Sequence, residues 1–369
     1  MNDLKSSERK LLEAFEAGEA RALARAISWV ENARPGFERL LSALHDRVGR
    51  AHRIGITGPP GAGKSTLIYG LARLVRQDGE RVGVVAVDPT SPFTGGALLG
   101  DRIRMVGTAG DDGVFIRSMA SRGSQGGLAT TSREVADLMD AFGFERVVVE
   151  TVGVGQSELE IAGAADTTVV VLTPESGDSI QAMKAGLMEI ADVFVVNKAD
   201  RPEAARAAGE LKTILRLRQG QVFDRIPAHH GVDLTAMAKR RMAEEAQAHG
   251  AAPETTDQAR DGPQAWEIPV LLTSAQNGEG VVELLETLES HYTLVKQTGE
   301  LAKRRAQRLL ERVRAVVDRG LRTRVWRDGE GEALLDAARV DLESGARTPY
   351  DVAAEIMGTV GSRSVGGER

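Results

Sequence analysis

Cysteine is absent from this chain of 369 residues. Its absence excludes disulfide bonds, thiolate-bound metals and cysteine nucleophiles. The sequence also lacks an apolar run of about 18 residues, which is the length that a membrane-crossing helix needs. The first residues include acidic side chains and no apolar stretch of the signal-peptide kind. We therefore expect a cytoplasmic protein with no part in a membrane.

Positive charge is not in excess either, because 47 lysines and arginines stand against 53 aspartates and glutamates, for a net charge of −6. Binding of duplex nucleic acid depends on clustered positive charge, so a nucleic-acid partner is not expected. What the chain does have is a globular composition, with 42% hydrophobic and 27% charged residues. A chain of this length can bury a sizeable core and favours two or three folding units.

The spacing of hydrophobic residues changes near residue 53. Before it, from residue 4 to 48, they recur at helical spacing, with a break at residues 34–36. After it, short β-branched runs alternate with longer helical stretches. The runs that we interpret as strands are residues 54–57, 82–87, 114–116, 147–151, 168–173, 193–197 and 270–273. Apolar strands that alternate with helices predict a mostly parallel sheet with helices on both faces.

These patterns predict an α/β fold with helical extensions at both ends. Residues 295–325 show the pattern of a basic amphipathic helix, and the later half of the polar stretch 243–265 favours a mobile loop. The parts that we expect are an N-terminal helical segment 1–50, an α/β domain 51–294, a C-terminal helical segment 295–357 and a disordered tail 358–369.

A phosphate-binding motif follows the first predicted strand. Residues 58–65 read Gly-Pro-Pro-Gly-Ala-Gly-Lys-Ser, which fits G-x-x-x-x-G-K-[ST] between a strand and a helix and predicts a P-loop NTPase. Glycines let the backbone curl so that N–H groups point at phosphate oxygens, and the helix N-terminus adds partial positive charge. Lys64 would reach the β- and γ-phosphates, and Ser65 would ligate Mg²⁺. The phosphate-binding residues that we predict are Gly58, Gly61, Ala62, Gly63, Lys64, Ser65 and Thr66.

Acidic residues at strand ends are the candidate partners of the metal. Asp88 ends the second predicted strand, where an acid faces the ligand crevice of a parallel sheet, although it could instead cap the following turn. Asp101, in a glycine-rich stretch, is a second candidate. Glu150 ends a later strand and precedes Gly153, as an acid and a γ-phosphate-sensing glycine do in P-loop NTPases. The metal ligands that we predict are therefore Ser65, Asp88, Asp101 and Glu150.

A second motif predicts recognition of guanine. The sequence Asn197-Lys198-Ala199-Asp200 follows an apolar strand, and N-K-x-D in this position is the guanine-reading motif of GTPases. The carboxylate of Asp200 would accept hydrogen bonds from the N1–H and 2-amino groups of guanine, which adenine cannot offer. Ser274 and Ala275 follow the last strand and match the loop whose N–H groups contact guanine O6.

Hydrolysis of GTP is predicted to be slow. The residue after Gly153 is Val154, whereas small GTPases place a water-positioning glutamine there. Another group or a partner would therefore have to complete the site. Taken together, the motifs predict a protein that binds GTP or GDP with Mg²⁺ and hydrolyses GTP as a switch.

Longer strings around these motifs resemble the MeaB/ArgK family of GTPases. The most specific is Glu-Thr-Val-Gly-Val-Gly-Gln-Ser-Glu at residues 150–158. Members of this family are chaperones of adenosylcobalamin-dependent acyl-CoA mutases, methylmalonyl-CoA mutase above all. The other strings that carry the resemblance are residues 58–65, 88–92, 95–102, 177–186 and 347–354.

The resemblance implies roles that spacing alone does not give. Asp88, Asp101 and Glu150 would be switch residues around Mg²⁺, and residues 177–188 would form a third switch with Asp178, Gln181 and Lys184. The protein would be a homodimer through its C-terminal region and would gate the loading, protection and reactivation of the mutase. On this combined basis, the predicted catalytic residues are Lys64, Asp101, Glu150, Gly153 and Lys184.

Three other functions fit the same motifs. A GTPase that inserts nickel is one, although the missing cysteines and the lack of a histidine cluster weigh against it. A phosphotransferase that acts on a transport protein is another, and the sequence offers no obvious acceptor-binding module for it. A pure binding module with incidental hydrolysis is the third.

Overall fold

The computed structural model describes residues 5–88, 111–120, 130–151, 160–175, 186–218, 266–327 and 329–362. The chain forms two compact units, Met1–Ala302 and Lys303–Arg369. In the described part, no helix is both long and apolar enough to cross a membrane. The polar stretch 243–265, whose later half is predicted to be a loop, lies outside the described residues.

The first unit begins with short helices, as the spacing of hydrophobic residues predicts. The expected break at residues 34–36 is confirmed, because Gly36 takes a left-handed φ of 98° between the second and third helices. The buried carboxylate of Glu8 pairs with Arg39, and these hydrogen bonds lower the pKa of Glu8. The elements are α1 (Ser6–Glu16), α2 (Ala20–Glu31), α3 (Phe37–Ala43) and the 3₁₀ turn η1 (His45–Arg47).

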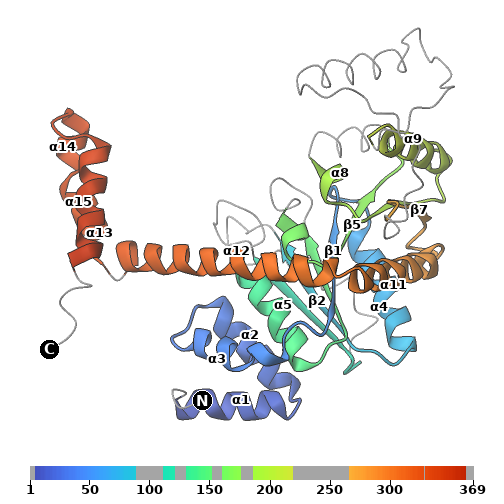
Figure 1. Ribbon diagram of the computed structural model, residues 1–369, viewed down its shortest axis with the longest axis horizontal. Helices are drawn as coiled ribbons and strands as arrows, with labels where there is room; N and C mark the ends of the chain where they lie inside the picture. The colour runs from blue at the N-terminus through green and yellow to red at the C-terminus, as the bar shows by residue number, and fades with distance from the viewer. Residues whose placement is uncertain are drawn as a thin grey trace, which may run out of the picture. The chain divides into compact units, whose positions relative to one another are not determined.

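The described strands form one parallel sheet of seven in the order β3-β2-β4-β1-β5-β6-β7 (Figure 1). All seven predicted strands are confirmed to within a few residues. The observed bounds are β1 (His52–Thr57), β2 (Val82–Asp88), β3 (Val114–Ala120), β4 (Arg146–Thr151), β5 (Thr167–Leu172), β6 (Val193–Asn197) and β7 (Val270–Thr273).

Helices cover both faces of this sheet, as the sequence predicts. One face packs against α4 (Lys64–Gln77) and α11 (Val281–Gln297), and the other packs against α5 (Thr130–Phe142), α8 (Leu187–Ile190) and α9 (Ala204–Arg218). The strands bury side chains in both directions, so on β4 Val148 faces α4 whereas Val147 and Val149 face α5. A short 3₁₀ turn, η3 (Ile161–Gly163), precedes β5.

A buried carboxylate joins the N-terminal helices to the sheet. Asp140 of α5 accepts hydrogen bonds from the backbone N–H groups of Gly49 (2.8 Å), Arg50 (3.1 Å) and Ala51 (3.0 Å). It also pairs with the guanidinium of Arg53 at 2.8 Å, and its side chain is 0% exposed. The stretch that enters β1 is therefore held by one side chain of α5.

The second unit is helical and contains more breaks than the sequence predicts. Most of the long helix α12 (Glu300–Arg322) belongs to it, followed by one π turn, η4 (Thr323–Arg327). Within the expected helical segment 295–357, one of these breaks falls at Gly345, which takes a left-handed φ of 75° and ends a helix. The observed elements are α13 (Gly331–Ala337), α14 (Arg339–Ser344) and α15 (Pro349–Ser362).

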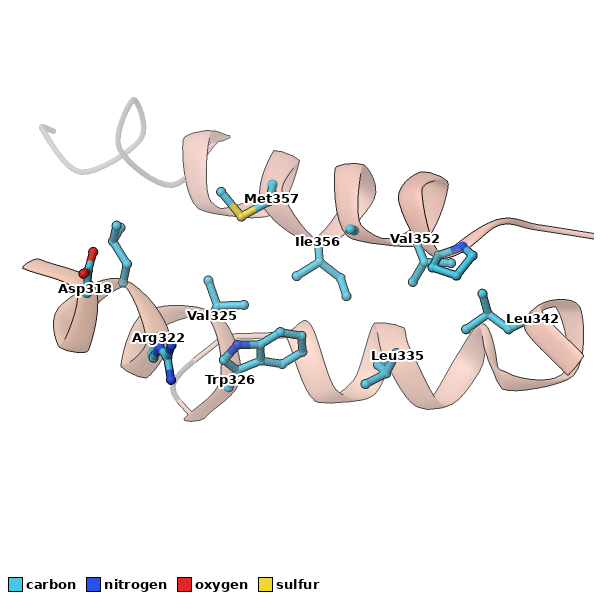
Figure 2. Close-up of a pocket in the computed structure, with 12 residues that line it drawn as sticks. Asp318, Arg322, Val325, Trp326, Leu335, Leu342, Val352, Ile356 and Met357 are labelled. Carbon is cyan, nitrogen blue, oxygen red and sulfur yellow. The ribbon is translucent and has the colours of Figure 1, made fainter. Parts of the chain in front are cut away.

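These helices enclose an apolar groove of about 590 Å³. Figure 2 shows Val352 and Ile356 of α15 on one side of the groove and Trp326, Leu335 and Leu342 on the other. Val352 and Ile356 are buried, whereas Trp326 is 42% and Leu335 39% exposed. The groove is thus apolar and partly open to solvent.

Candidate nucleotide site

The carboxyl end of β1 lies where the order of strands reverses. From β1 the chain moves toward β2 and β3 on one side and, later, toward β5, β6 and β7 on the other. Ligands of open α/β sheets bind in the crevice at such a reversal. The loop 58–63 leaves β1 at this point and leads into α4, so the predicted phosphate motif occupies the expected crevice.

Glycines at the two ends of this loop are required by its packing. Gly58 has a φ of 136°, and a Cβ atom there would lie 1.9 Å from the carbonyl oxygen of Val171 in β5. Gly63 has a φ of 87°, and its Cβ would lie 2.3 Å from the side-chain amide of Asn197. Residues with a side chain could not keep this path, so the loop packs directly on β5 and β6.

The ammonium group of Lys64 lies inside the curl of the loop. Its Nζ donates to the carbonyl oxygens of Gly58 (2.8 Å) and Pro59 (3.0 Å), and the residue is only 6% exposed. Lys64 is also the first residue of α4, after Gly63 in the N-cap position. A positive charge and a helix N-terminus therefore meet in one loop, which suits a polyphosphate.

Two of the predicted metal ligands are in contact. The hydroxyl of Ser65 donates to Glu150 Oε1 at 2.8 Å, and the two residues are 7% and 5% exposed. Asp88 is the last residue of β2, which pairs with β4 beside Glu150. The described residues contain no group of three or more histidine, cysteine or acidic side chains that could hold a metal, so within them Ser65 and Glu150 do not form a complete metal site.

Asn197 connects the phosphate loop to the loop that follows β7. Its amide nitrogen donates to the carbonyl of Ala62 at 2.8 Å. Its carbonyl oxygen accepts from the Thr273 hydroxyl (3.0 Å) and from the Ala275 N–H (3.1 Å). Asn197 is 3% exposed, so a single buried amide joins two loops that are 213 residues apart in sequence, from Ala62 to Ala275.

The other residues of the predicted base motif lie on a fixed turn. Ser274 donates its hydroxyl to Asp200 Oδ1 at 3.0 Å, which orients the carboxylate. The Ala199 N–H bonds to the Thr273 carbonyl at 2.9 Å. Lys198 takes a left-handed φ of 60°, which is uncommon for a residue with a side chain. The structure thus brings together Asn197, Lys198, Asp200, Ser274 and Ala275, as the sequence predicts.

Two residues that the sequence analysis does not predict also lie at this turn. Glu175, three residues beyond the end of β5, contacts the guanidinium of Arg201 and lies 3.8 Å from Lys198 Nζ. The sequence signal is weak, because an acid after a strand and an arginine after N-K-x-D each look like ordinary surface residues.

Several predicted residues lie outside the described part of the chain. They are Asp101, Gly153, Asp178, Gln181 and Lys184, and only the backbone of Asp88 is described. Their roles therefore rest on the sequence alone. Of the predicted catalytic residues, Lys64 and Glu150 lie in the site that the structure describes, at the carboxyl ends of β1 and β4.

Several known proteins are similar to this chain in sequence. A protein of Pyrococcus horikoshii whose name places it among the GTPases is 42% identical over 308 residues, 84% of this chain and 85% of its own. The GTPase ArgK of Escherichia coli is 44% identical over 187 residues, 50% of this chain and 56% of its own. A mouse protein, the methylmalonic aciduria type A homolog, mitochondrial, is 32% identical over 310 residues, 80% of this chain and 66% of its own.

A solved structure shares the fold. The crystal structure of a LAO/AO transport system kinase matches with a TM-score of 0.61 at 24% identity, over 98% of this chain and 99% of that one. The fold is that of a P-loop NTPase, and the relatives support hydrolysis of GTP. Residues 23–330 match the family described as methylmalonyl Co-A mutase-associated GTPase MeaB. The chain is therefore a GTPase that belongs to the MeaB family.

Proposed function

We propose that this GTPase binds GTP and Mg²⁺ at the carboxyl edge of its sheet and acts as a slow switch for an adenosylcobalamin-dependent acyl-CoA mutase. The observation that carries the nucleotide part is the Asn197 amide, which ties the phosphate loop at Ala62 to the base loop at Ala275. A loop for the polyphosphate and a turn for the base are thereby held as one site. The mutase part is supported by the description of the family.

The polyphosphate would bind in the loop that contains Lys64. Its ammonium already lies against the carbonyls of Gly58 and Pro59, and negative phosphate oxygens are better partners than neutral carbonyls. Loop N–H groups and the start of α4 would share the remaining charge. This cradle stabilises the charge that builds up on the phosphates during hydrolysis.

Mg²⁺ fits the chemistry of Ser65 and Glu150. Both offer oxygen, which is the donor that Mg²⁺ prefers, and both are buried beside Lys64. We propose Ser65 and Glu150 as two of the residues that hold the ion, with Asp88 and Asp101 completing the set. When bound, the ion would supply positive charge beside the phosphate groups.

The guanine base would be read by Asp200. Because Ser274 already donates to Oδ1, the carboxylate is held in place for the N1–H and 2-amino groups of the base. The Ala275 N–H and the stem of Lys198 lie on the same pair of loops. Asp200 is exposed in this structure, and a bound base would cover it. Adenine offers that carboxylate no N1–H and no 2-amino group, so a covered Asp200 would lose its hydrogen bonds to water without replacement and adenine would bind weakly.

Calorimetry tests this site directly. We expect tight, Mg²⁺-dependent binding of GTP and GDP and no measurable binding of ATP. In Asp200→Asn the amide nitrogen can donate to the 2-carbonyl of xanthine, so preference should move from guanosine to xanthosine nucleotides. Equal affinity for GTP and ATP, or an Asp200→Asn variant that still prefers GTP, would overturn the assignment.

We propose that GTP turnover is slow because no glutamine stands at the position that orients the attacking water in small GTPases. With Val154 after Gly153, we expect isolated protein to hydrolyse GTP well below the rates of dedicated hydrolases. Lys184, Asp101 and Gly153 are the residues that we propose to complete catalysis, on the strength of the family resemblance. A turnover of hundreds per second would contradict a slow switch.

The second unit supports a homodimer. Apolar side chains of α12 form a stripe at intervals of three or four residues, and each is exposed: Leu310 (61%), Val313 (61%), Val317 (52%) and Leu321 (43%). A stripe with this spacing is typical of a helix that packs against a partner. We propose that a second copy of the chain covers it, together with the groove beside Trp326.

Co-purification tests whether a mutase is the partner of this GTPase. We expect the full chain to retain an adenosylcobalamin-dependent acyl-CoA mutase, with retention that differs between GDP and a non-hydrolysable GTP analogue. If no mutase associates in any nucleotide state, the chaperone role fails while the GTPase assignment stands. Tightly bound stoichiometric nickel, or transfer of the γ-phosphate to a protein, would favour the other functions. Residence in the cytoplasm stays a prediction from the sequence.

A further inference from the structure

The turn that carries the base motif is rigid in its backbone but not in the Lys198 side chain. Hydrogen bonds hold the turn on two sides, from Ala199 N–H to Thr273 (2.9 Å) and from Arg201 N–H to the Lys198 carbonyl (3.0 Å). The left-handed φ of 60° at Lys198 fixes where its side chain starts. Four rotatable bonds remain in that side chain, which is 31% exposed.

Glu175 is placed to restrict this side chain. It follows β5, the strand that lies between the P-loop strand β1 and the base-motif strand β6. Its Oε1 atom lies 3.8 Å from Lys198 Nζ and also contacts Arg201. One carboxylate oxygen of Glu175 therefore lies near two cations of the same turn. Because the carboxylate also pairs with Arg201, it stays in place when the Lys198 side chain moves.

We propose that Glu175 is a positioning residue for guanine recognition, acting through Lys198 with Arg201 as its anchor. By attracting the ammonium, Glu175 extends the lysine so that its methylene stem lines one side of the base site. The inference deepens the proposed function, because it assumes that Lys198 and Asp200 read the base. Glu175 would then contribute to guanine specificity although it lies outside the nucleotide-binding motifs.

Exposure sets the size of the effect. Glu175 is 50% exposed and Arg201 44%, so water and salt screen both ion pairs. Exposed ion pairs contribute little, and we expect Glu175→Gln to weaken GDP binding by about 2- to 5-fold, through faster dissociation. The loss should shrink at high salt, because the pairing is then screened already.

The test separates positioning from general damage by using a ligand without a base. Fluorescent GDP analogue dissociation is measured for wild type, Glu175→Gln and the control Glu203→Gln, an exposed glutamate just beyond the same turn. Inorganic tripolyphosphate is then used to displace the analogue. We expect weaker nucleotide binding in Glu175→Gln alone, with the inhibition constant of tripolyphosphate unchanged.

A double-mutant cycle shows whether Lys198 carries the effect. Glu175→Gln should lose its effect on GDP affinity in a Lys198→Met background, where no ammonium is left to position. The same loss in both backgrounds, an equal loss for tripolyphosphate, or a Glu175→Gln variant that matches Glu203→Gln would each overturn the inference.

The outcome for wild type decides which idea has failed. If wild-type protein does not prefer GDP over ADP, the proposed base site itself is wrong. If it does prefer GDP and the cycle shows no coupling between Glu175 and Lys198, the positioning role alone is wrong.

Discussion

At the scale of single residues, the site depends on atoms that come very close to one another. The two glycines at the ends of the phosphate loop show this, because Gly58 meets a backbone carbonyl of β5 and Gly63 meets the Asn197 amide. The motif predicts that glycine stands at both positions. It does not predict the partners, because Val171 and Asn197 lie more than 100 residues further along the chain.

Gly58→Ala should abolish nucleotide binding. Its Cβ would lie 1.9 Å from the Val171 carbonyl oxygen, and backbone atoms of a central strand cannot move aside cheaply. Gly79→Ala is the matched control, since Gly79 lies outside the site and also has a positive φ, 82°, but no described atom lies within 4 Å of its Cβ position. Calorimetric titration with GDP checks both, and equal affinities would show that the loop does not depend on β5.

At the scale of secondary structure, the sequence predicts the strands well and the polar links between elements poorly. Apolar β-branched runs are sufficient to locate β1 to β7, because the strands inside the sheet are buried on both faces and the edge strands β3 and β7 are still largely apolar. The four contacts of Asp140 depend instead on where α5 packs. No local pattern distinguishes this aspartate from Asp46, which is exposed. The same holds for Glu175 and Arg201, which meet only in the folded sheet.

Asp140→Ala should destabilise the first unit strongly. The change removes the acceptor of three backbone N–H groups and leaves the Arg53 guanidinium without one of its carboxylates. We expect the free energy of unfolding to fall by about 3–5 kcal/mol, as for other broken buried pairs. Urea unfolding measures it, with Asp46→Ala as the exposed control. A loss equal to that of the control would contradict the anchoring role.

The start of α15 has a capping box that makes the second unit sensitive to acid. Asp351 accepts from the N–H (3.0 Å) and hydroxyl (2.7 Å) of Thr348, and the Asp351 N–H donates back to that hydroxyl (3.2 Å). These hydrogen bonds, with the hydroxyl one largest, hold the pKa of the Asp351 carboxyl below its ordinary value of 3.8. The charged form therefore stabilises the folded unit. That stabilisation is present above pH 3.8 and is lost as the pH falls through the lowered pKa.

Asp351→Asn should consequently lower the melting temperature at pH 7, and the gap from wild type should close as the pH falls below about 4. Trp326 fluorescence reports it in a background with Trp29→Phe and Trp266→Phe, because those are the other tryptophans of the chain. Asp341→Asn, at an exposed position of α14, provides the control. A gap that stays constant with pH would rule out the charged cap.

At the scale of the whole molecule, two compact units with different surfaces share one chain. The first unit buries its apolar side chains on both sides of the sheet, whereas the second exposes many of its own. The sequence predicts an amphipathic helix over 295–325. It does not predict the number of helices after it, although Gly345 and Pro349 are signals for a break. It also gives no reason for α15 to continue to Ser362, beyond the expected end at 357.

Polar substitutions on the exposed stripe of α12 should separate the copies of the proposed dimer. Leu310→Gln with Val313→Gln removes apolar area that is 61% exposed at each position, so folding of one chain should change little. Light scattering after size exclusion should show a dimer for wild type and for the control Arg314→Gln, and a monomer for the double variant. A monomeric wild type at micromolar concentration would contradict the proposal.

The amide of Asn197 also bears on how nucleotide could leave. The buried side chain of Asn197 is hydrogen-bonded to both loops, so a displacement of the phosphate loop should also displace the base loop, and the reverse. A partner protein that promotes nucleotide release would therefore need to contact only one of the two loops. Without the Asn197 amide, the phosphates and the purine could dissociate from their loops independently.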